Sequence, residues 1–185
     1  MAVILPFALA TLGVVCPLWI YCSLVRARSR ALEAWFDMEM ELRRRSHLIP
    51  NLVETVRGHA RHELEIFAEV TRARGVLAKA AEPLAVTAAD GSLTLALARL
   101  ISMAESHPQV RAVSSFHHLR KQLSETEQKI ASAKQFYNRS AMAYNAAIQS
   151  FPGNLFARRY HFDPVSLFGP RPAFEPELKV ISTAA

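Results

Sequence analysis

His59, His62 and Glu63 are the residues whose spacing comes closest to that of a metal site. In a helix they occupy positions i, i+3 and i+4, so two imidazoles and one carboxylate would share a face and could hold a divalent ion. The spacing is not the HExxH of zinc peptidases, and no third distant ligand is evident. Glu63 also falls on an apolar seam, where a buried carboxylate bonded to another helix is the alternative. We therefore predict a structural role, no metal and no cofactor, with metal binding as the competing hypothesis.

Signatures of other enzymes do not occur in the sequence. No glutamate has a histidine three residues later, which excludes the paired ExxH motifs of a di-iron bundle. The six glycines form no nucleotide-binding loop, and there is no G-x-S-x-G nucleophile motif. Cys16 and Cys22, the two cysteines, lie in an uncharged segment and build neither a disulfide framework nor a cysteine-based zinc site. We predict no catalytic residue and a protein that is not an enzyme.

The basic residues are the next candidates for binding. The chain has 22 lysines and arginines against 16 acidic residues, which gives a net charge of +6. Arg43, Arg44 and Arg45 suggest nucleic acid at first sight, but Glu39 and Glu41 are interleaved with them. We expect this triplet on a solvated helix face or in contact with lipid, and no nucleic-acid partner.

Two tyrosines and three asparagines are the polar residues of the most distinctive stretches: Asn51, Tyr137, Asn138, Tyr144 and Asn145. Tyr137 and Tyr144 extend an apolar helix face, and we expect their hydroxyls to reach polar groups of the first helix. One interpretation is that all five are core residues with satisfied hydroxyls and amides. The sharper hypothesis is that they line a partner groove, opened where Pro50 kinks the first helix.

Residues 1–25 contain no charged side chain and are predicted to be a membrane anchor. As a helix they would be roughly 37 Å long, more than the hydrocarbon thickness of a bilayer, and no basic residues precede them as in a cleaved signal peptide. Arg26, Arg28 and Arg30 follow at once. The positive-inside rule then places the N-terminus outside and the rest in the cytoplasm, with these three arginines available for lipid contact.

The remaining chain has the apolar periodicity of long helices. Apolar residues recur at steps of seven from Trp35 to Leu77, with Glu63 as the exception, which predicts one sustained helix. Pro50 is expected to kink it near Leu48 and Ile49 without ending it. Residues 82–92, which include a proline and an Asp-Gly pair, are the predicted turn that sends the chain back.

A short helix is predicted over residues 93–105, and a long one runs from the capping-box residues Ser106 and Gln109 to Ser150. The long helix carries large residues at six consecutive positions spaced seven apart: Phe116, Leu123, Ile130, Tyr137, Tyr144 and Phe151. The chain beyond it is irregular but rich in phenylalanine. We expect this tail to pack on the end of the bundle or on the membrane surface, where Arg158 and Arg159 could meet lipid phosphates.

Together these elements predict an all-α protein. Its fold is an N-terminal transmembrane helix followed by an antiparallel helical bundle of three to four helices, two of them long. The predicted units are the anchor at residues 1–25, the bundle at residues 26–157 and an aromatic, irregular tail at residues 158–185.

Three stretches resemble the LemA family of bacterial single-pass membrane proteins: residues 35–63, with RRxxLIPNLVxTV; residues 97–112; and residues 126–157, with FYNxxxxxYNxxIxxFPxNL. From the first of these stretches to the last, the resemblance covers about two thirds of the chain. It implies an N-terminal anchor with a short outer end, a soluble helical bundle and no established enzymatic activity. The chain departs from the family pattern after Asn154, where family members usually end in a compact GFxxxxYFE-like segment.

The resemblance also implies a setting. Family members are linked to magnetosome membranes, and others resemble partners of membrane proteases by gene neighbourhood. We therefore expect a non-enzymatic interaction or scaffold module at the bacterial inner membrane, with one unidentified protein partner, for which a membrane protease is a candidate. The alternatives are a factor that organises the membrane, motivated by the basic juxtamembrane cluster and the aromatic tail, and a metal-binding activity at His59, His62 and Glu63.

Overall fold

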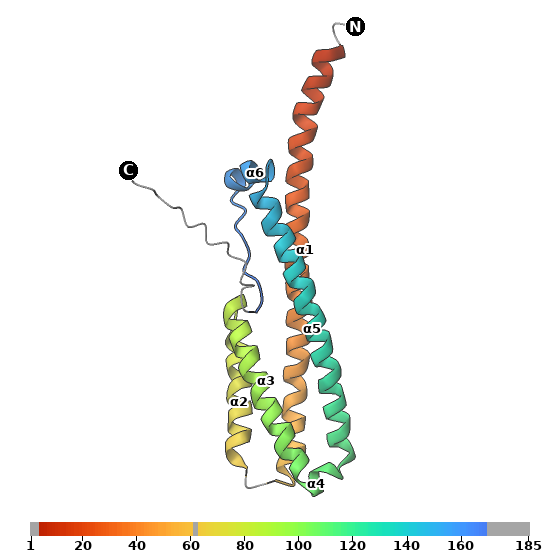
Figure 1. Cartoon of the computed structure of the whole chain (residues 1–185), viewed down its shortest axis with the longest axis vertical. Helices are drawn as coiled ribbons and strands as arrows, with labels where there is room; N and C mark the ends of the chain where they lie inside the picture. The colour runs from red at the N-terminus through yellow and green to blue at the C-terminus, as the bar shows by residue number, and fades with distance from the viewer. Residues whose placement is uncertain (1–3, 61–62, 170–185) are drawn as a thin grey trace, which may run out of the picture.

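A computed structural model describes residues 4–60 and 63–169, with side chains from residue 15 onward, and the predicted all-α class is confirmed for that part of the chain. The helices are α1 (Ile4–Arg57), α2 (Leu64–Lys79), α3 (Pro83–Ser106), α4 (Pro108–Arg111), α5 (Ser114–Gln149) and α6 (Gly153–Tyr160). The chain runs down α1, up α2, down α3 and up α5, and α6 crosses at the end from which α1 protrudes (Figure 1).

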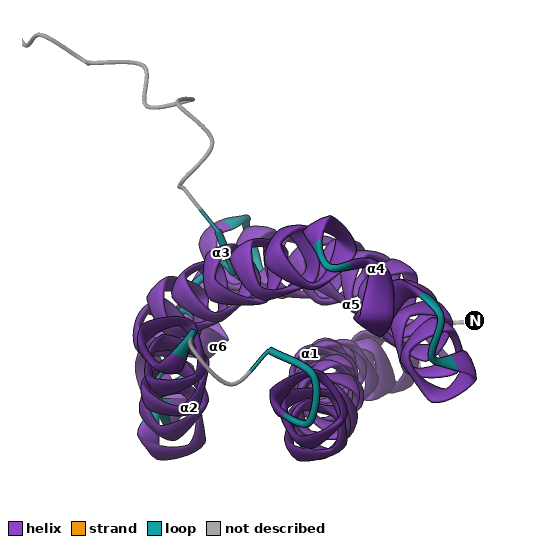
Figure 2. Ribbon diagram, turned by 90° about the horizontal axis from the view of Figure 1, so that it is seen from below, coloured by secondary structure: helices purple, strands orange, loops and turns teal. Residues whose placement is uncertain are grey.

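The long helices follow one another around an arc in the order α2, α3, α5, α1 (Figure 2). Helix α1 packs along α5, and α2 packs along α3. The main core lies inside this arc, and it includes Met38 and Leu52 of α1, Phe67 of α2 and Leu93 of α3, all 2% exposed or less. A smaller apolar cluster around Leu24 lies where α1, α5 and α6 meet.

Helix α1 is one 54-residue helix that continues through Pro50, as expected. The prediction that it extends to Leu77 is wrong, because the helix ends at Arg57 and the chain re-enters helix only at Leu64. Gly58 follows the last helical residue, and glycine is a poor helix former. The seven-residue register nevertheless survives the reversal: Val56 of α1 and Val70 of α2 are both fully buried, so periodicity alone could not reveal the break.

The predicted turn at residues 82–92 is also wrong. The turn occupies residues 80–82, and α3 begins at Pro83, a residue that suits the first turn of a helix. Asp90 and Gly91 therefore lie inside α3. Asp90 is buried, and its carboxylate is bound by basic side chains of other helices, which offsets the weak helix propensity of the Asp-Gly pair.

The second long helix starts later than predicted. Helix α4 is a single turn, and the chain bends at residues 112–113 before α5 begins at Ser114. The expected capping box does not form, because the Ser106 hydroxyl donates to the carbonyl of Met103 at 2.7 Å. The end of α5 next to Ser150 is confirmed. The first five residues of its seven-residue repeat are buried, whereas Phe151, beyond the helix end, is 81% exposed.

Within the described residues, α3 is the helix that is long and apolar enough to cross a bilayer. Leu93 and Leu100 of α3 are fully buried and the helix packs on α2, so its apolar face contributes to the bundle core. The span predicted at residues 1–25 lies largely outside the described side chains and stays a prediction.

Candidate functional site

Two Tyr-Asn pairs of α5 bind the chain's own C-terminal segment. We call Tyr137, Asn138, Tyr144 and Asn145 the clamp, and residues 162–169 the tail segment. The Tyr137 hydroxyl donates to the carbonyl of Ser166 at 2.6 Å, and the Tyr144 hydroxyl donates to the carbonyl of Asp163 at 3.0 Å. Each tyrosine therefore satisfies one backbone acceptor of a segment that has no regular structure of its own.

Each asparagine of the clamp pairs with both polar groups of one tail residue. The Asn145 side-chain amide donates to the Val165 carbonyl at 2.8 Å and accepts from the Val165 N–H at 2.9 Å. Asn138 makes the same two bonds with Phe168, both at 2.8 Å. The primary amide acts as a peptide group would in a β-ladder, so the irregular tail gains sheet-like pairing on a helix.

The spacing of the clamp matches the spacing of the tail. Seven helical residues advance about 10.5 Å, and three extended residues advance about 10 Å. The Tyr-Asn pairs are seven residues apart, and the units they bind, Asp163 with Val165 and Ser166 with Phe168, are three apart. The clamp therefore recognises a backbone repeat, and it fixes the register of the tail.

Aromatic packing and burial support the two tyrosines. The Trp35 ring of α1 meets the Tyr137 ring edge-on, with 5.3 Å between centroids. Burial raises the pKa of the Tyr137 phenol. Burial also raises the pKa of Tyr144, while the nearby Arg28 charge opposes the shift and Asp163 adds to it. Both phenols are therefore held in the protonated form, which is the form that donates.

The clamp corrects the prediction for the tyrosine hydroxyls and leaves the groove hypothesis open. The expectation that the tyrosine hydroxyls reach polar groups of the first helix is wrong, since both donate to tail carbonyls. Four of the five predicted groove residues come together, but Asn51 is exposed on α1, sixteen residues beyond the Trp35 that contacts Tyr137. The space beside the four is filled by the tail segment, including the buried Phe162 and Phe168.

A buried ionic cluster joins three helices below the clamp. The Arg45 guanidinium of α1 is fully buried and binds the carboxylates of Asp90 in α3 and Glu127 in α5, and it donates to the Thr94 hydroxyl at 3.0 Å. Lys134 of α5 binds the other oxygen of Asp90 at 2.5 Å. Charges taken out of water need such mutual pairing, so the cluster fixes α1, α3 and α5 relative to one another.

The cluster overturns the prediction for the arginine triplet. Arg43 and Arg44 are exposed as expected, but Arg45 points inward and contacts neither solvent nor lipid. A signal was present in the sequence, because Arg45 lies seven residues from both Met38 and Leu52, on an apolar seam. A charged residue on such a seam indicates a buried partner elsewhere in the chain.

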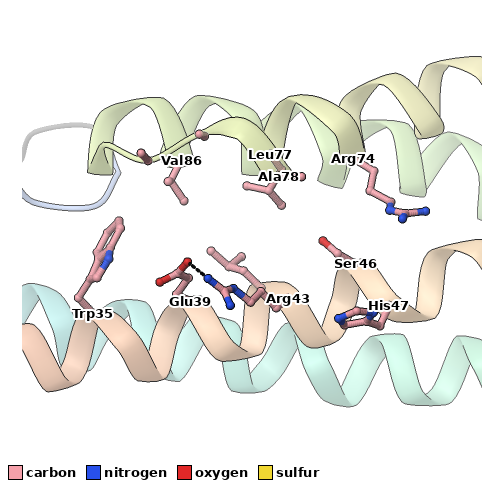
Figure 3. A pocket seen from close by; sticks show the side chains of 12 residues that line it. Trp35, Glu39, Arg43, Ser46, His47, Arg74, Leu77, Ala78 and Val86 are labelled. Atoms are coloured by element: carbon pink, nitrogen blue, oxygen red, sulfur yellow. Dashed lines mark hydrogen bonds and ion pairs between the residues drawn. The ribbon is translucent and has the colours of Figure 1, made fainter.

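An open groove lies between α1 and α2. Its cavity of about 460 Å³ is lined on one side by Trp35, Leu42 and Arg43 of α1, and on the other by Arg74 and Leu77 of α2 (Figure 3). Two arginines and one carboxylate border it, and the Arg43 guanidinium and the Glu39 carboxylate form an ion pair at 2.7 Å. Apolar side chains line the groove between these charged groups. Such a surface can accept an apolar helix that carries acidic groups.

The histidine group does not have the geometry on which the metal hypothesis depended. His59 lies in the turn after α1 and is exposed, with Nδ1 3.3 Å from the Thr55 carbonyl, and Glu63 stands at the N-cap of α2. The two residues therefore do not share one helix face. His62 lies outside the described residues. In the part of the chain that the structure describes, no three metal-binding side chains cluster.

Comparisons with known proteins give one consistent relationship. The model of the LemA family matches residues 34–180. The magnetosome protein MamQ of Magnetospirillum gryphiswaldense is 29% identical over 163 residues, and so are the magnetosome proteins MamQ 1 and MamQ 2 of Paramagnetospirillum magneticum. Each match covers 74% of this chain and 60% of the relative, so the chain spans less than two thirds of these curated relatives. Neither the family description nor these names denote a reaction.

Proposed function

Because the chain belongs to the LemA family, we propose that it is a non-enzymatic helical bundle, anchored in a bacterial inner membrane, that binds a partner protein on its cytoplasmic side. The observation that carries this proposal is the continuity of α1. One helix of 54 residues includes most of the uncharged N-terminal segment and also one wall of the bundle. The anchor and the binding surface are therefore parts of one rigid element.

The exposed side chains at the start of the described part support an anchor. Val15, Leu18 and Trp19 are 61–66% exposed, although they are large and apolar. In Figure 1 the N-terminal end of α1 extends beyond all other helices. A soluble protein would cover such a surface, whereas lipid makes it favourable.

The arginines after the anchor support its orientation and its depth. Arg26, Arg28 and Arg30 are all exposed, and Arg26 donates to the Cys22 carbonyl at 3.2 Å. We propose that they lie at the cytoplasmic headgroups, with the N-terminus outside. A cysteine-free background (C16A/C22A) with one new cysteine tests this. An impermeant maleimide applied to spheroplasts should label A2C and not L95C, and the reverse pattern would invert the topology.

We place the protein partner in the groove between α1 and α2. The groove borders about twelve residues of α1, which corresponds to three helical turns or roughly 18 Å. Its apolar lining and its two arginines favour an amphipathic helix with acidic side chains, such as a segment of a membrane protease or another membrane protein.

Site-specific photo-crosslinking in native membranes tests this placement. A photoreactive residue at Ala78, which is exposed and lines the groove, should crosslink to the partner, whereas one at Ala98, an exposed alanine of α3 outside the groove, should not. A78W should fill the groove and abolish the complex without altering helicity. Equal crosslinking at both alanines, or a complex that survives A78W, would argue against the groove.

A membrane-organising role is the second candidate, and the similarity to magnetosome proteins favours it. Its test is reconstitution of the purified full chain into anionic vesicles of phosphatidylglycerol and phosphatidylcholine. Tubulation or a narrowed size distribution in electron micrographs would support this role, and unchanged vesicles would leave only the partner-binding one.

A further inference from the structure

Helix α6 is held against α1 at a defined height. The Tyr160 ring of α6 meets the Tyr21 ring of α1 edge-on at 5.1 Å, and the Phe162 ring lies 6.0 Å from Tyr21. At the other end of α6, a side chain on Gly153 would come within 3.6 Å of Leu24. Helix α6 therefore lies beside the stretch of α1 between Tyr21 and Leu24.

That height corresponds to the headgroup layer if α1 spans the membrane. The uncharged segment would be roughly 37 Å long as a helix, and the hydrocarbon core of a bilayer is about 30 Å thick. Arg26 is the first charged side chain after this segment, so the cytoplasmic end of the span lies just before it, at residues 21–25. The part of α1 that contacts α6 thus lies at the boundary between acyl chains and headgroups.

The outer surface of α6 has the composition of an interfacial helix. Phe151, just before α6, is 81% exposed, and Leu155 and Tyr160 are 64% and 53% exposed. Arg158 and Arg159 are exposed on the last turn, and α6 contains no acidic residue. Leu155 and Arg159 are one turn apart, so an apolar contact and a cation share a side of the helix.

The fold leaves α6 little freedom to choose another position. A Cβ on Gly153 would lie 2.1 Å from the carbonyl oxygen of Ala147, so α6 packs backbone to backbone on the end of α5. His161 ends α6 in the left-handed conformation, and the Phe162 N–H then donates to the Ala157 carbonyl at 3.1 Å. The exposed side chains of α6 are therefore presented in a fixed orientation.

We propose that α6 binds the surface of an anionic membrane beside the anchor. Phe151 and Leu155 enter the boundary of the acyl chains, and Arg158 and Arg159 bind lipid phosphates. Arg26 and Arg28 extend this basic surface along α1. This inference rests on the proposed anchor and adds a second lipid contact, which holds the bundle upright on the membrane.

Electron paramagnetic resonance on the full chain tests the contact. In a C16A/C22A background, nitroxide labels at L155C and L95C provide a matched pair, because both leucines are about equally exposed, at 64% and 65%, on α6 and α3. In nanodiscs of phosphatidylglycerol and phosphatidylcholine, the label at 155 should collide with oxygen more, and with an aqueous nickel complex several-fold less, than the label at 95. The protein itself leaves both positions open, so only lipid can protect position 155.

A second comparison tests the arginines. Each basic residue near an anionic surface raises binding by about fivefold at low salt, so R158Q/R159Q should shift the ratio of bundles that rest on the lipid to bundles tilted away from it by about 25-fold. R99Q/R120Q removes two exposed, ion-paired arginines elsewhere and should change nothing.

The outcomes separate this inference from the proposed anchor. If the chain enters the nanodiscs but both labels are equally accessible to nickel, α6 does not touch lipid and the inference is overturned while the anchor stands. If the chain does not enter the nanodiscs, the anchor fails and the inference falls with it. If R158Q/R159Q leaves the protection of position 155 unchanged, the assigned role of the arginines is wrong.

Discussion

The ionic cluster and the clamp both hold together segments that are far apart in the chain, but they use different chemistry. Both include side chains of α5. The cluster uses charged side chains that bind one another, so every member depends on the identity of its partners. The clamp uses neutral amides and phenols that bind backbone groups, so it depends on the spacing of the tail and not on its side chains.

This difference predicts that the cluster and the tail segment respond differently to substitution. A substitution in the cluster leaves a buried charge without a counterion, which is costly for the whole bundle. A substitution in the tail segment leaves most clamp bonds intact, but a change in its length disrupts them. The cluster should therefore govern the stability of the fold, and the clamp should govern only whether the tail is attached.

The largest expected effect is that of Asp90→Ala. It leaves the fully buried Arg45 with Glu127 alone, and breaking a buried pair in this way costs about 3–5 kcal/mol. Urea denaturation of the full chain in a mild detergent, followed by circular dichroism, measures the loss.

The double variant R45M/D90L provides the control. It removes both charges and fills the space with apolar atoms, and it should recover most of the stability lost in Asp90→Ala. If the single variant were as stable as the wild type, the cluster would not organise the bundle.

A change of register should have a smaller and more local effect. One glycine inserted between Val165 and Ser166 breaks the three-residue spacing, so only one Tyr-Asn pair can stay bound at a time. Losing the two hydrogen bonds of one asparagine should weaken the binding of the tail by about 1–3 kcal/mol. Hydrogen exchange should speed up at the Val165 or Phe168 amide and not within the core of α5.

An insertion after Gly169 is the matched control, because it lies beyond the last bond of the clamp and should leave both amides protected. Asn145→Leu keeps the approximate size of the side chain but removes both its donor and its acceptor, so it should release Val165 alone. Unchanged exchange in both the register variant and Asn145→Leu would contradict the clamp.

Gly91→Ala should stabilise the helix that carries the cluster. Gly91 lies within α3, and a Cβ there would meet nothing within 4 Å. Replacing glycine by alanine in a helix gains about 0.5–1 kcal/mol, which thermal unfolding of the full chain would show as a higher melting temperature. Gly153→Ala should instead lower it, because its Cβ collides with the Ala147 carbonyl.

Titration of the two clamp tyrosines does not affect stability at neutral pH and lowers it only at alkaline pH. Burial raises the pKa of Tyr137 and Tyr144 above the usual 10.0, so the folded state holds these protons more tightly than the unfolded state. Their contribution to stability is complete below pH 10 and declines as the pH rises beyond it. Y137F/Y144F should be less stable than the wild type at pH 9 and show a smaller further loss by pH 11. If the wild type and Y137F/Y144F lost equal stability between pH 9 and pH 11, the raised pKa of the tyrosines would be contradicted.

The regular parts of the fold were predictable because they obey one period. The repeat along α5 indicated six large residues on one face, and the five that lie within the helix are buried whereas Phe151 is exposed. The proline and glycine after Ser150 indicated the helix end, which is confirmed. Periodicity failed at the reversal after Arg57, because two antiparallel helices can keep the same register. It failed again at Asp90, where partners from other helices override a local turn signal.

The candidate site was only half visible in the sequence. The two Tyr-Asn pairs stood out by their repetition, but their partners are backbone groups, which every residue carries, so no residue type in the tail pointed to them. The seven-residue spacing of Arg45 from Met38 and Leu52 marked it as buried, but the two exposed arginines before it suggested a solvated triplet instead.

Because α1 is uninterrupted, a tilt at one end of the helix moves its other end. Between Val25 and Arg57 the helix is about 48 Å long, so leaning it by about 10° swings the far end sideways by about 8 Å. Bilayers of different thickness change the lean of a spanning helix. If α1 spans the membrane as proposed, a local thinning of the lipid would therefore move whatever is bound at the opposite end of the helix sideways.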